Sequence, residues 1–172
     1  MELIVSTETV IAFLERVCTR AYQDIKRLYL RARFDGRIFF GKNVNFRTPF
    51  FCRVGPSGRI VIGKNTFLNY GVKIIAHESI TIGSGCLFGP NAGIYDFDHI
   101  HELDGTPYGA QGMSTEAVVI GNNVWIGANS VILKESVIGD NAVIAADTVV
   151  SGEVPPDSLV FDHKERVTRI RK

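Results

Sequence analysis

The stretch IGNNVWIGANSVILKESVIGDNAVIAADTVV, residues 120–150, repeats itself every six residues. Its aliphatic position recurs without slippage at Ile120, Ile126, Ile132, Ile138, Ile144 and Val150. A six-residue period fits neither a helix nor a meander of long strands. It predicts short strands joined by tight bends, three strands to a coil, with the aliphatic side chains inside a triangular prism.

Earlier copies of the repeat extend this prism toward the N-terminus. They read IGKNTF (62–67), LNYGVK (68–73), IGSGCL (82–87) and FGPNAG (88–93). Between about residues 100 and 117 the repeat is broken by the polar, turn-rich segment HELDGTPYGAQGMST. We expect a loop extruded from the prism there, because a segment rich in turn residues and without a period does not form a coil. Long loops inside a strict repeat are more often functional than accidental, so this one is a candidate for part of a site.

The N-terminal segment has a different period. Between residue 8 and about residue 33, apolar side chains recur at steps of three and four, which predicts an amphipathic helix. They are Val10, Leu14, Val17, Ala21, Ile25 and Leu28, and the opposite side carries Arg16, Arg20, Arg27 and Arg31 with Glu15 and Asp24. We expect this helix to dock on the body or on a neighbouring subunit with its charged face in solvent. Attraction of the arginine-rich face to an anionic membrane surface is the alternative.

Length and charge indicate one main body that does not bind nucleic acid. A chain of 172 residues is long enough for one compact domain and too short for two ordinary ones. We divide it into a helical segment (1–35), a prism (36–160) and a basic tail (161–172). The net charge of +1 argues against nucleic acid as the main partner, because neutralising phosphates needs a basic surplus.

The cysteines and the first residues favour the cytoplasm. Cys18, Cys52 and Cys86 lie far apart, so neither a disulfide framework nor a paired-cysteine metal site is indicated. Glu2 stands where a signal peptide would be basic. No stretch approaches the roughly 18 uninterrupted apolar residues that a membrane span needs. We therefore expect a cytoplasmic protein.

The segment from Ile62 to Pro156 resembles the galactoside, maltose and surface-polysaccharide O-acetyltransferases of the hexapeptide-repeat family. The shared motifs stand here as IGKNTFLNYG, IGSGCLFGP, DFDHIHELDG and IGNNVWIG, in the same order and at nearly the same spacing. The resemblance implies an all-β main body, a left-handed parallel β-helix with an N-terminal α-helix and one extruded loop. It also implies acetyl-CoA as co-substrate, no metal, and a homotrimer with its sites between subunits.

By the same resemblance, the general base of the reaction is His99. Imidazole suits this task because its unperturbed pKa of about 6.5 lets it accept a proton from an alcohol at neutral pH. His101 is the rival base and otherwise a substrate contact, and both histidines could also simply be exposed on a polar loop. Asp96, Asp98 or Glu102 could orient the imidazole, and we include Asp98 among the substrate-binding residues.

Two further residues are candidates for binding the acceptor. The resemblance assigns Asn69 to the asparagine that contacts the acceptor, since an amide can both donate to and accept from a sugar hydroxyl. At a prism corner, an asparagine can instead bond only to backbone. Eight positions later relatives often carry an acidic residue, whereas this chain has His77. His77 is therefore a possible acceptor contact, and this departure leaves the identity of the acceptor open.

The resemblance also implies a set of residues that bind the coenzyme. Trp125 would line the cleft, and the backbone amide of Ala128 would receive the thioester oxygen. Ala146 would leave room for the pantetheine arm. Lys164 and Arg166 in the basic tail would meet the phosphates, although such a tail is equally well a solvated surface.

Several functions remain open at this stage. O-acetylation of a sugar in bacterial surface-polysaccharide biosynthesis is favoured by the arrangement of Asn69, His99 and Trp125. The alternative enzyme is a sugar N-acetyltransferase acting on a nucleotide-linked amino sugar. A γ-type zinc carbonic anhydrase would need three histidines around a metal, for which His77, His99 and His101 could be counted. A non-catalytic β-helical scaffold is the remaining possibility.

Overall fold

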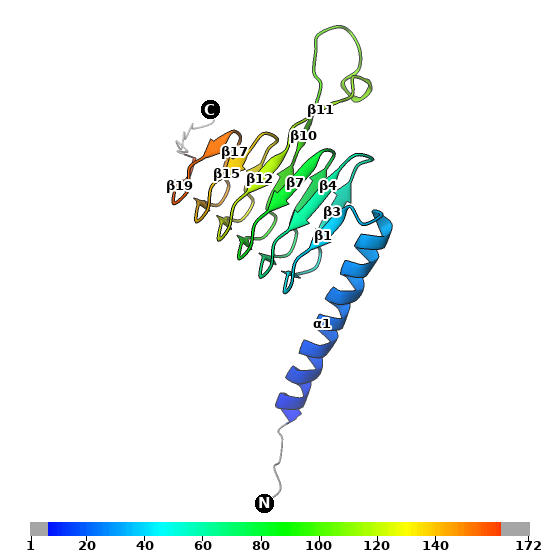
Figure 1. Cartoon of the computed structure of the whole chain (residues 1–172), viewed down its shortest axis with the longest axis vertical. Helices are drawn as coiled ribbons and strands as arrows, with labels where there is room; N and C mark the ends of the chain where they lie inside the picture. Colours follow the sequence, from blue (N-terminus) through cyan, green and yellow to red (C-terminus); the bar gives the residue numbers. More distant parts are fainter. Residues whose placement is uncertain (1–6, 163–172) are drawn as a thin grey trace, which may run out of the picture.

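The computed structural model describes residues 7–162, which form one long helix followed by a stack of coils (Figure 1). The helix α1 (Thr7–Arg33) leads into the first strand, β1 (Ile38–Phe40). From there each coil is laid on the previous one, and the stack ends at β19 (Leu159–Val160), the strand farthest from α1 (Figure 1).

Three parallel sheets form the faces of the prism. Face 1 contains β1, β4 (Arg59–Ile62), β7 (Ser79–Ile82), β12 (Val118–Ile120), β15 (Val137–Ile138) and β18 (Glu153–Val154). Face 2 contains β2 (Asn45–Phe46), β5 (Phe67–Leu68), β8 (Leu87–Phe88), β13 (Trp125–Ile126), β16 (Val143–Ile144) and β19. Face 3 contains β3 (Phe51–Val54), β6 (Lys73–Ala76), β9 (Gly93–Tyr95), β14 (Val131–Ile132) and β17 (Val149–Val150).

The core is a set of columns that run along the inside of the prism. On face 2 the strand register stacks Phe46, Leu68, Phe88, Ile126 and Ile144, and each of these side chains is almost fully buried. Neighbouring strands are about 4.8 Å apart, so successive side chains in a column are in contact. Burying one such side chain contributes about 1.5–3 kcal/mol. The aliphatic positions of the repeat all point inward, and the predicted prism is confirmed.

The corners of the prism explain the other recurring positions of the repeat. A Cβ atom on Gly127 would lie 2.4 Å from the backbone nitrogen of Ala146, so the close approach of the next coil requires glycine there. At the corner between faces 1 and 2, Asn123 and Asn141 occupy equivalent positions in successive coils. Their φ angles are positive, 54° and 61°, which asparagine tolerates well. Asn123 donates to Asn141, and Asn141 donates to Asp157, each over 2.9 Å. These amides form a ladder that ties successive corners together.

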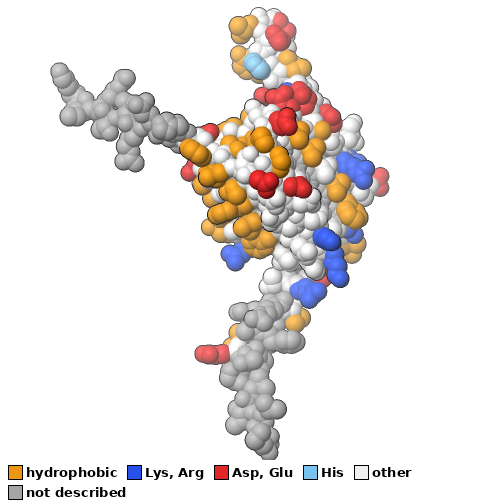
Figure 2. Space-filling view, turned by 60° about the vertical axis from the view of Figure 1, so that its left-hand side comes forward, with side chains coloured by type: hydrophobic (Ala, Val, Ile, Leu, Met, Phe, Trp, Pro, Cys, Tyr) orange, Lys and Arg blue, Asp and Glu red, His pale blue; other side chains and the backbone are white. Residues whose placement is uncertain are grey.

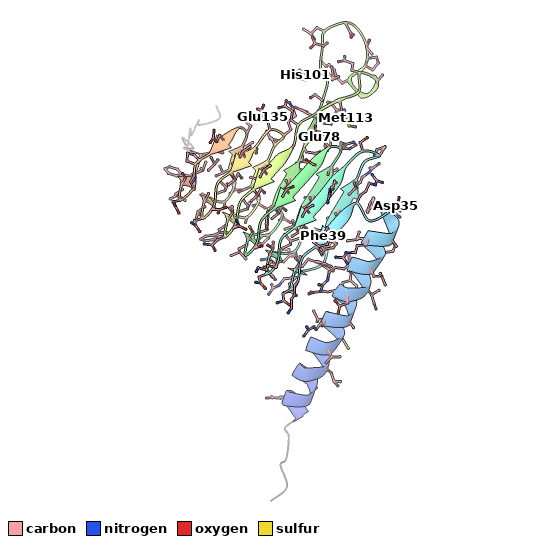
Figure 3. The ribbon with its side chains drawn as sticks, viewed as in Figure 1. Asp35, Phe39, Glu78, His101, Met113 and Glu135 are labelled. Carbon is pink, nitrogen blue, oxygen red and sulfur yellow. The ribbon has the colours of Figure 1, made fainter. Side chains whose placement is uncertain are left out.

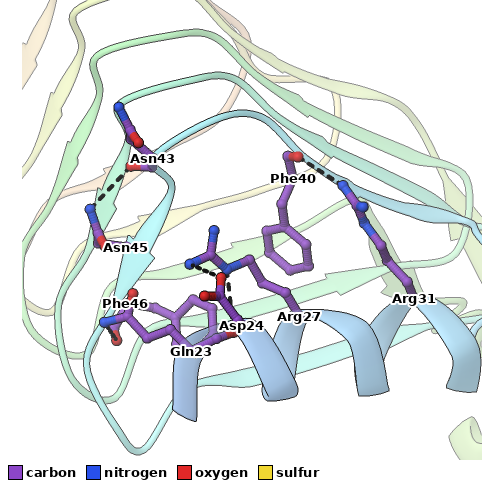
Figure 4. A network of polar contacts seen from close by, with 8 residues as sticks. All are labelled: Gln23, Asp24, Arg27, Arg31, Phe40, Asn43, Asn45 and Phe46. Atoms are coloured by element: carbon purple, nitrogen blue, oxygen red, sulfur yellow. Dashed lines mark hydrogen bonds and ion pairs between the residues drawn. The ribbon is translucent and has the colours of Figure 1, made fainter. Parts of the chain in front are cut away.

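The C-terminal half of α1 lies across the first coil and contacts it through polar side chains (Figure 4), whereas the N-terminal half extends beyond the prism (Figure 1). Gln23 and Arg31 donate to the backbone carbonyls of Phe46 and Phe40, at 3.3 and 2.9 Å. Lys26 donates to the carbonyl of Phe50 at 3.3 Å. These bonds satisfy carbonyl groups at the end of the prism, where no earlier coil precedes them.

The apolar stripe of α1 faces away from the prism. Leu14, Val17, Ile25 and Leu28 are all exposed, and Leu28 is 70% exposed. The expectation that this stripe docks on the chain's own body is therefore wrong; the buried apolar contact is made by Leu30 on the other side of the helix. Among the described residues, no helix is both long and apolar enough to cross a bilayer.

The break in the repeat is an extruded segment. Its stem is a pair of antiparallel strands, β10 (Phe97–His99) and β11 (Met113–Thr115), and its tip contains a short 3₁₀ turn, η1 (Tyr108–Ala110). Residues 101–110 are all exposed. The predicted loop is present, but its stem begins three residues earlier than expected, so that His99 lies in a strand rather than in a turn.

Candidate active site

An apolar groove of about 620 Å³ runs along face 2 and its corner with face 3. The structure brings together in it four of the predicted residues, Asn69, Trp125, Ala128 and Ala146. The remaining lining residues are Leu87, Phe88, Gly89, Pro90, Gly127, Val143, Ile144, Ala145 and Leu159. The groove therefore crosses five successive coils, from Asn69 to Leu159.

The floor of the groove is a ladder of outward-facing apolar side chains. The strand register places Trp125 between Leu87 and Val143, and Val143 beside Leu159. Trp125 and Leu159 are more than half exposed. Figure 2 shows hydrophobic side chains gathered along one flank of the prism, on the side where the described chain ends. An exposed apolar surface of this kind suits a long, flexible ligand or a neighbouring protein surface.

The backbone N–H of Ala128 is available to a ligand. At the corresponding place one hexad earlier, the Asn122 N–H donates to the Asp140 carboxylate at 2.6 Å. Within the described part of the chain, the Ala128 N–H has no such acceptor, although the Ala128 carbonyl accepts from the Asp147 N–H at 2.8 Å. A free N–H beside an apolar wall is the kind of donor that stabilises a developing oxyanion.

Only one of the two polar groups of the Asn69 side chain forms a hydrogen bond within the described residues. Its Oδ1 atom accepts from the Tyr70 N–H at 2.9 Å, which matches the backbone-bonding alternative. Its Nδ2 group has no acceptor among residues 7–162, so the amide still has two N–H groups for a ligand. The side chain therefore contributes to local structure and can also bind a ligand in the groove.

The histidine pair lines a second hollow, on the extruded segment. This hollow, of about 460 Å³, is formed by Asp98, His99, His101, Tyr108 and Gly109. Figure 3 places His101 above Met113 on the segment that leaves the prism. The structure thus brings three predicted residues, Asp98, His99 and His101, together, but in a place separate from the groove.

No carboxylate orients the imidazole of His99 within the described residues. The Asp98 carboxylate accepts instead from the backbone N–H of His99, at 2.8 Å. His101 Nδ1 lies 3.1 Å from the carbonyl of His99. Glu102 bonds through its backbone to Gln111. The exposed imidazole of His99 is therefore free to bond to groups outside its own chain.

Asp96 holds the base of the extruded segment. Its buried carboxylate accepts from the backbone N–H groups of His77 and Glu78, at 2.7 and 2.8 Å. Its backbone carbonyl accepts from the Glu116 N–H on the returning stem, at 2.9 Å. Glu116 in turn pairs with Lys134 of the next coil at 3.0 Å, and this hydrogen bond raises the pKa of the Lys134 ammonium group. Asp96 thus ties the stem to the prism through its carboxylate and holds the returning strand through its backbone carbonyl.

His77 is connected to the histidine hollow through an aromatic side chain. Its ring packs against Phe97 with centroids 4.5 Å apart, and Phe97 meets His99 edge-on at 6.3 Å. His77 therefore supports the stem that carries His99, at the prism end of β10. Among residues 7–162, no group of three or more His, Cys, Asp or Glu side chains is arranged to hold a metal ion, which gives the carbonic anhydrase alternative no support.

Face 3 separates the groove from the histidine hollow in one chain. Pro90 of the groove precedes β9, and the extruded segment leaves the prism directly after β9. The two hollows therefore lie at opposite edges of face 3, and His99 does not reach the groove of its own chain. The two remaining predicted residues, Lys164 and Arg166, lie outside the described residues.

Sequence comparisons give the family. The bacterial transferase hexapeptide (six repeats) family matches residues 117–152, and the hexapeptide repeat of succinyl-transferase matches residues 79–94. The putative lipopolysaccharide biosynthesis O-acetyl transferase WbbJ of Escherichia coli (strain K12) is 33% identical over 137 residues, which cover 74% of this chain and 69% of that protein. This chain belongs to the hexapeptide-repeat acetyltransferases. The galactoside O-acetyltransferase of the same strain is 34% identical over 133 residues, but the chain spans 62% of its length.

A solved structure agrees with this assignment. The hexapeptide-repeat containing acetyltransferase VCA0836 of Vibrio cholerae O1 biovar eltor, complexed with acetyl coenzyme A, superposes with a TM-score of 0.66. It is 31% identical, over 90% of this chain and 84% of that one. The predicted family, the left-handed parallel β-helix and the enzyme class, an acyltransferase, are thereby confirmed.

Several residues around the two hollows were not predicted from the sequence. Leu87 and Leu159 in the groove carry no signal beyond the outward position of the repeat. Tyr108 lies in an aperiodic segment, so nothing indicated that it returns to the histidines. Asp96 was considered as an orienting group for the imidazole, and its bonds to backbone were not foreseen. The position of Asp96 directly before an extruded segment is the one signal that could have suggested an anchor.

Proposed function

We propose that this chain transfers an acetyl group from acetyl-CoA to a hydroxyl group of a sugar, in the biosynthesis of a bacterial surface polysaccharide such as capsule, O-antigen or exopolysaccharide. The observation that carries this proposal is the apolar groove that joins Trp125, Ala128 and Ala146, in a fold shared with an acetyltransferase complexed with acetyl coenzyme A. The relatives named for lipopolysaccharide and galactoside O-acetylation favour a saccharide hydroxyl as acceptor.

His99 acts as the general base. Its imidazole takes the proton of the sugar hydroxyl as the hydroxyl oxygen attacks the carbonyl carbon of the thioester. Negative charge develops on the carbonyl oxygen, and the N–H of Ala128 donates to it. When the carbon–sulfur bond breaks, His99 returns the proton to the departing sulfur. The products are an acetyl ester and free coenzyme A, and the chain itself forms no covalent intermediate.

The groove binds the coenzyme, and Asn69 at its edge contacts the acceptor. The apolar ladder of Trp125 and Leu159 covers the pantetheine arm, and the short side chain of Ala146 leaves the arm room to lie along the corner. The free Nδ2 group of Asn69 bonds to a hydroxyl of the acceptor. Lys164 and Arg166 bind the phosphates of the coenzyme through charge-assisted hydrogen bonds.

A second copy of the chain completes the site. His99 lies at the far edge of face 3 from the groove, so it serves the groove of a neighbouring subunit. A homotrimer, with three prisms side by side, repeats this pairing three times and leaves no site incomplete. We also propose that residues 36–160 form the catalytic unit, between the helical segment 1–35 and the tail 161–172, and that the enzyme works in the cytoplasm.

The test is thiol release from acetyl-CoA in the presence of a panel of saccharides, with wild type and the variant His99→Ala. We expect kcat to fall by at least about 10²-fold in this variant, because a positioned base contributes that much. His101→Ala is the matched control, since it removes the neighbouring imidazole, and we expect a much smaller loss. Full turnover in His99→Ala together with an inactive His101→Ala would exchange the roles of the two histidines.

The same assay separates the proposed reaction from N-acetylation. The panel includes sugars paired with their 2-amino analogues, free and nucleotide-linked, and the acetylated product is identified by mass spectrometry and alkaline hydrolysis. An ester is cleaved by mild alkali and an amide is not. Products that resist alkali, formed on amino sugars alone, would contradict the O-acetyl assignment while leaving the acyltransfer intact.

A further inference from the structure

The side of α1 that faces away from the prism is a continuous apolar surface. Ile11, Leu14, Val17, Ile25 and Leu28 are all about half exposed or more. At 100° per residue they fall within one arc of the helix, opposite the arc that holds Gln23 and Leu30 against the first coil. We name this arc the outward face of α1.

The border of the outward face has the composition of a helix that lies at a lipid–water boundary. Tyr22 and Tyr29, both about half exposed, lie at one edge, where an aromatic ring with a polar tip fits the headgroup level. Arg20 and Arg33 are exposed beyond the two edges. Asp24 also lies at one edge and is paired with Arg27 at 3.2 Å. The helix therefore combines an uncharged apolar arc with flanks rich in arginine.

Charge is divided sharply along the chain. Residues 7–73 contain thirteen Lys and Arg but four Asp and Glu, whereas residues 74–162 contain one Lys and twelve Asp and Glu. In the prism, exposed cations such as Lys42, Arg47 and Lys64 belong to the first coils, beside α1. In the view of Figure 2, basic side chains gather toward α1 and acidic ones toward the extruded segment. Within residues 7–162, the end that carries the outward face is thus cationic, and the coils farther from α1 are acidic.

The placement of α1 turns this face away from the rest of the molecule. The bonds of Gln23, Lys26 and Arg31 to carbonyls of the first coil fix the C-terminal half of α1 across the end of the prism, so the outward face points away from the coils. If the proposed trimer forms, with prisms side by side, all three outward faces point in the same direction. No subunit then covers the outward face of another.

A second copy bound through the same face, with α1 against α1, is disfavoured by charge. Such a contact would bring two cationic ends together, with thirteen Lys and Arg against four Asp and Glu on each side. An anionic surface has the opposite effect, because it attracts the cationic end and repels the acidic coils behind it. We propose that the outward face of α1 docks on an anionic lipid bilayer, with the prism standing on the membrane and the extruded segment in the aqueous phase.

This proposal has a consequence for the proposed function, although it does not depend on turnover. The groove and the histidine hollow lie on the flanks of the prism, so docking through α1 leaves both open to the aqueous phase. The enzyme would then work at a membrane surface. Binding to lipid and acetyl transfer to a soluble acceptor are separate measurements, and either can fail without the other.

The experiment is co-sedimentation of the full chain with vesicles, of phosphatidylcholine alone or with about 30 mol% phosphatidylglycerol. We expect binding to the anionic vesicles and little to the neutral ones, with loss of binding when the salt is raised from about 0.1 to 0.5 M. In the double variant Ile25→Glu and Leu28→Glu, we expect the partition coefficient for anionic vesicles to fall at least about 10-fold.

The control is Leu103→Glu, which places one glutamate, half of the added charge, on a leucine that is 93% exposed on the extruded segment. We expect its vesicle binding to change by less than about twofold, since a single charge far from the bilayer is screened. Acetyl transfer to a soluble acceptor and circular dichroism show that each variant is folded. Equal vesicle binding by wild type and the double variant would overturn the proposal.

A second measurement decides whether protein rather than lipid covers the face. Light scattering gives the mass of wild type and of the double variant in the absence of vesicles. We expect the same mass for both. A wild type that does not sediment with anionic vesicles, together with a double variant of lower mass, would replace the bilayer by a second copy of the chain.

Discussion

The prism and the extruded segment are held in place by different means. The prism is determined by burial, because its columns of side chains, such as Phe88 and Ile126 on face 2, are wholly enclosed. In the extruded segment, residues 101–110 are all exposed, and its position depends on a few polar bonds at the stem, chiefly those of Asp96. The base of the proposed reaction is on the part with little burial. Within the chain, its position therefore rests on the anchor at the stem.

The two regions should differ most in how much stability is lost when a side chain is truncated. Ile126→Ala opens a cavity in a column with close neighbours above and below, and should lower the free energy of unfolding by about 2–5 kcal/mol. Leu103→Ala, on the extruded segment, should leave it nearly unchanged. Denaturant titration followed by circular dichroism measures both. Similar losses in the two variants would mean that the extruded segment is packed against another surface in solution.

A smaller difference is expected for adding a single methyl group. In Gly127→Ala the new Cβ would lie 2.4 Å from the backbone nitrogen of Ala146, so the coils must separate locally, at a cost of about 1–3 kcal/mol. Gly109→Ala in the extruded segment meets no atom within 4 Å and serves as the control. Thermal unfolding of both variants checks this, with a lower midpoint expected only in the prism.

The anchor of the extruded segment should affect catalysis more than stability. Asp96→Asn keeps the shape of the side chain but replaces one acceptor oxygen by a donor, so one of the two bonds to the His77 and Glu78 N–H groups is lost. The cost in stability should be about 1–3 kcal/mol. We expect kcat to fall while KM for acetyl-CoA stays close to that of wild type. A variant that loses coenzyme affinity instead would show that Asp96 supports the prism rather than the base.

The smallest effect concerns thiol reactivity and leaves the fold intact. Burial raises the pKa of the Cys52 thiol to about 12 and also raises the pKa of Cys86, so both stay protonated at neutral pH, and the thiolate is the reactive form. Cys18 is exposed on α1. Under native conditions iodoacetamide should modify Cys18 first, as seen by peptide mass spectrometry. Equal modification of Cys86 would mean that the prism opens readily.

The sequence predicted the prism well because its signal is periodic. Each aliphatic residue from Ile120 to Val150 occupies an equivalent place, so an error at one position is corrected by the next. Trp125 and Ala128 do line one groove, but their assignment to the coenzyme came from the resemblance to the O-acetyltransferases and stays a prediction. By contrast, the roles of Tyr108 and Asp96 depend on how an aperiodic segment folds back, which no spacing encodes. The apolar stripe of α1 does not pack on its own prism, because an amphipathic pattern does not state which surface covers its apolar side; docking on a neighbouring subunit stays a prediction.

Because α1 covers the first coil, it also prevents further strands from adding to that end of the prism. A parallel stack ends in strands whose free carbonyl groups would accept another strand, and such open edges invite fibre formation. Here the side chains of Gln23, Lys26 and Arg31 occupy carbonyls at that end. The helix thus caps this end of the stack. A chain from which residues 1–33 have been removed should tend to polymerise, with the first coil of one copy against the last coil of the next.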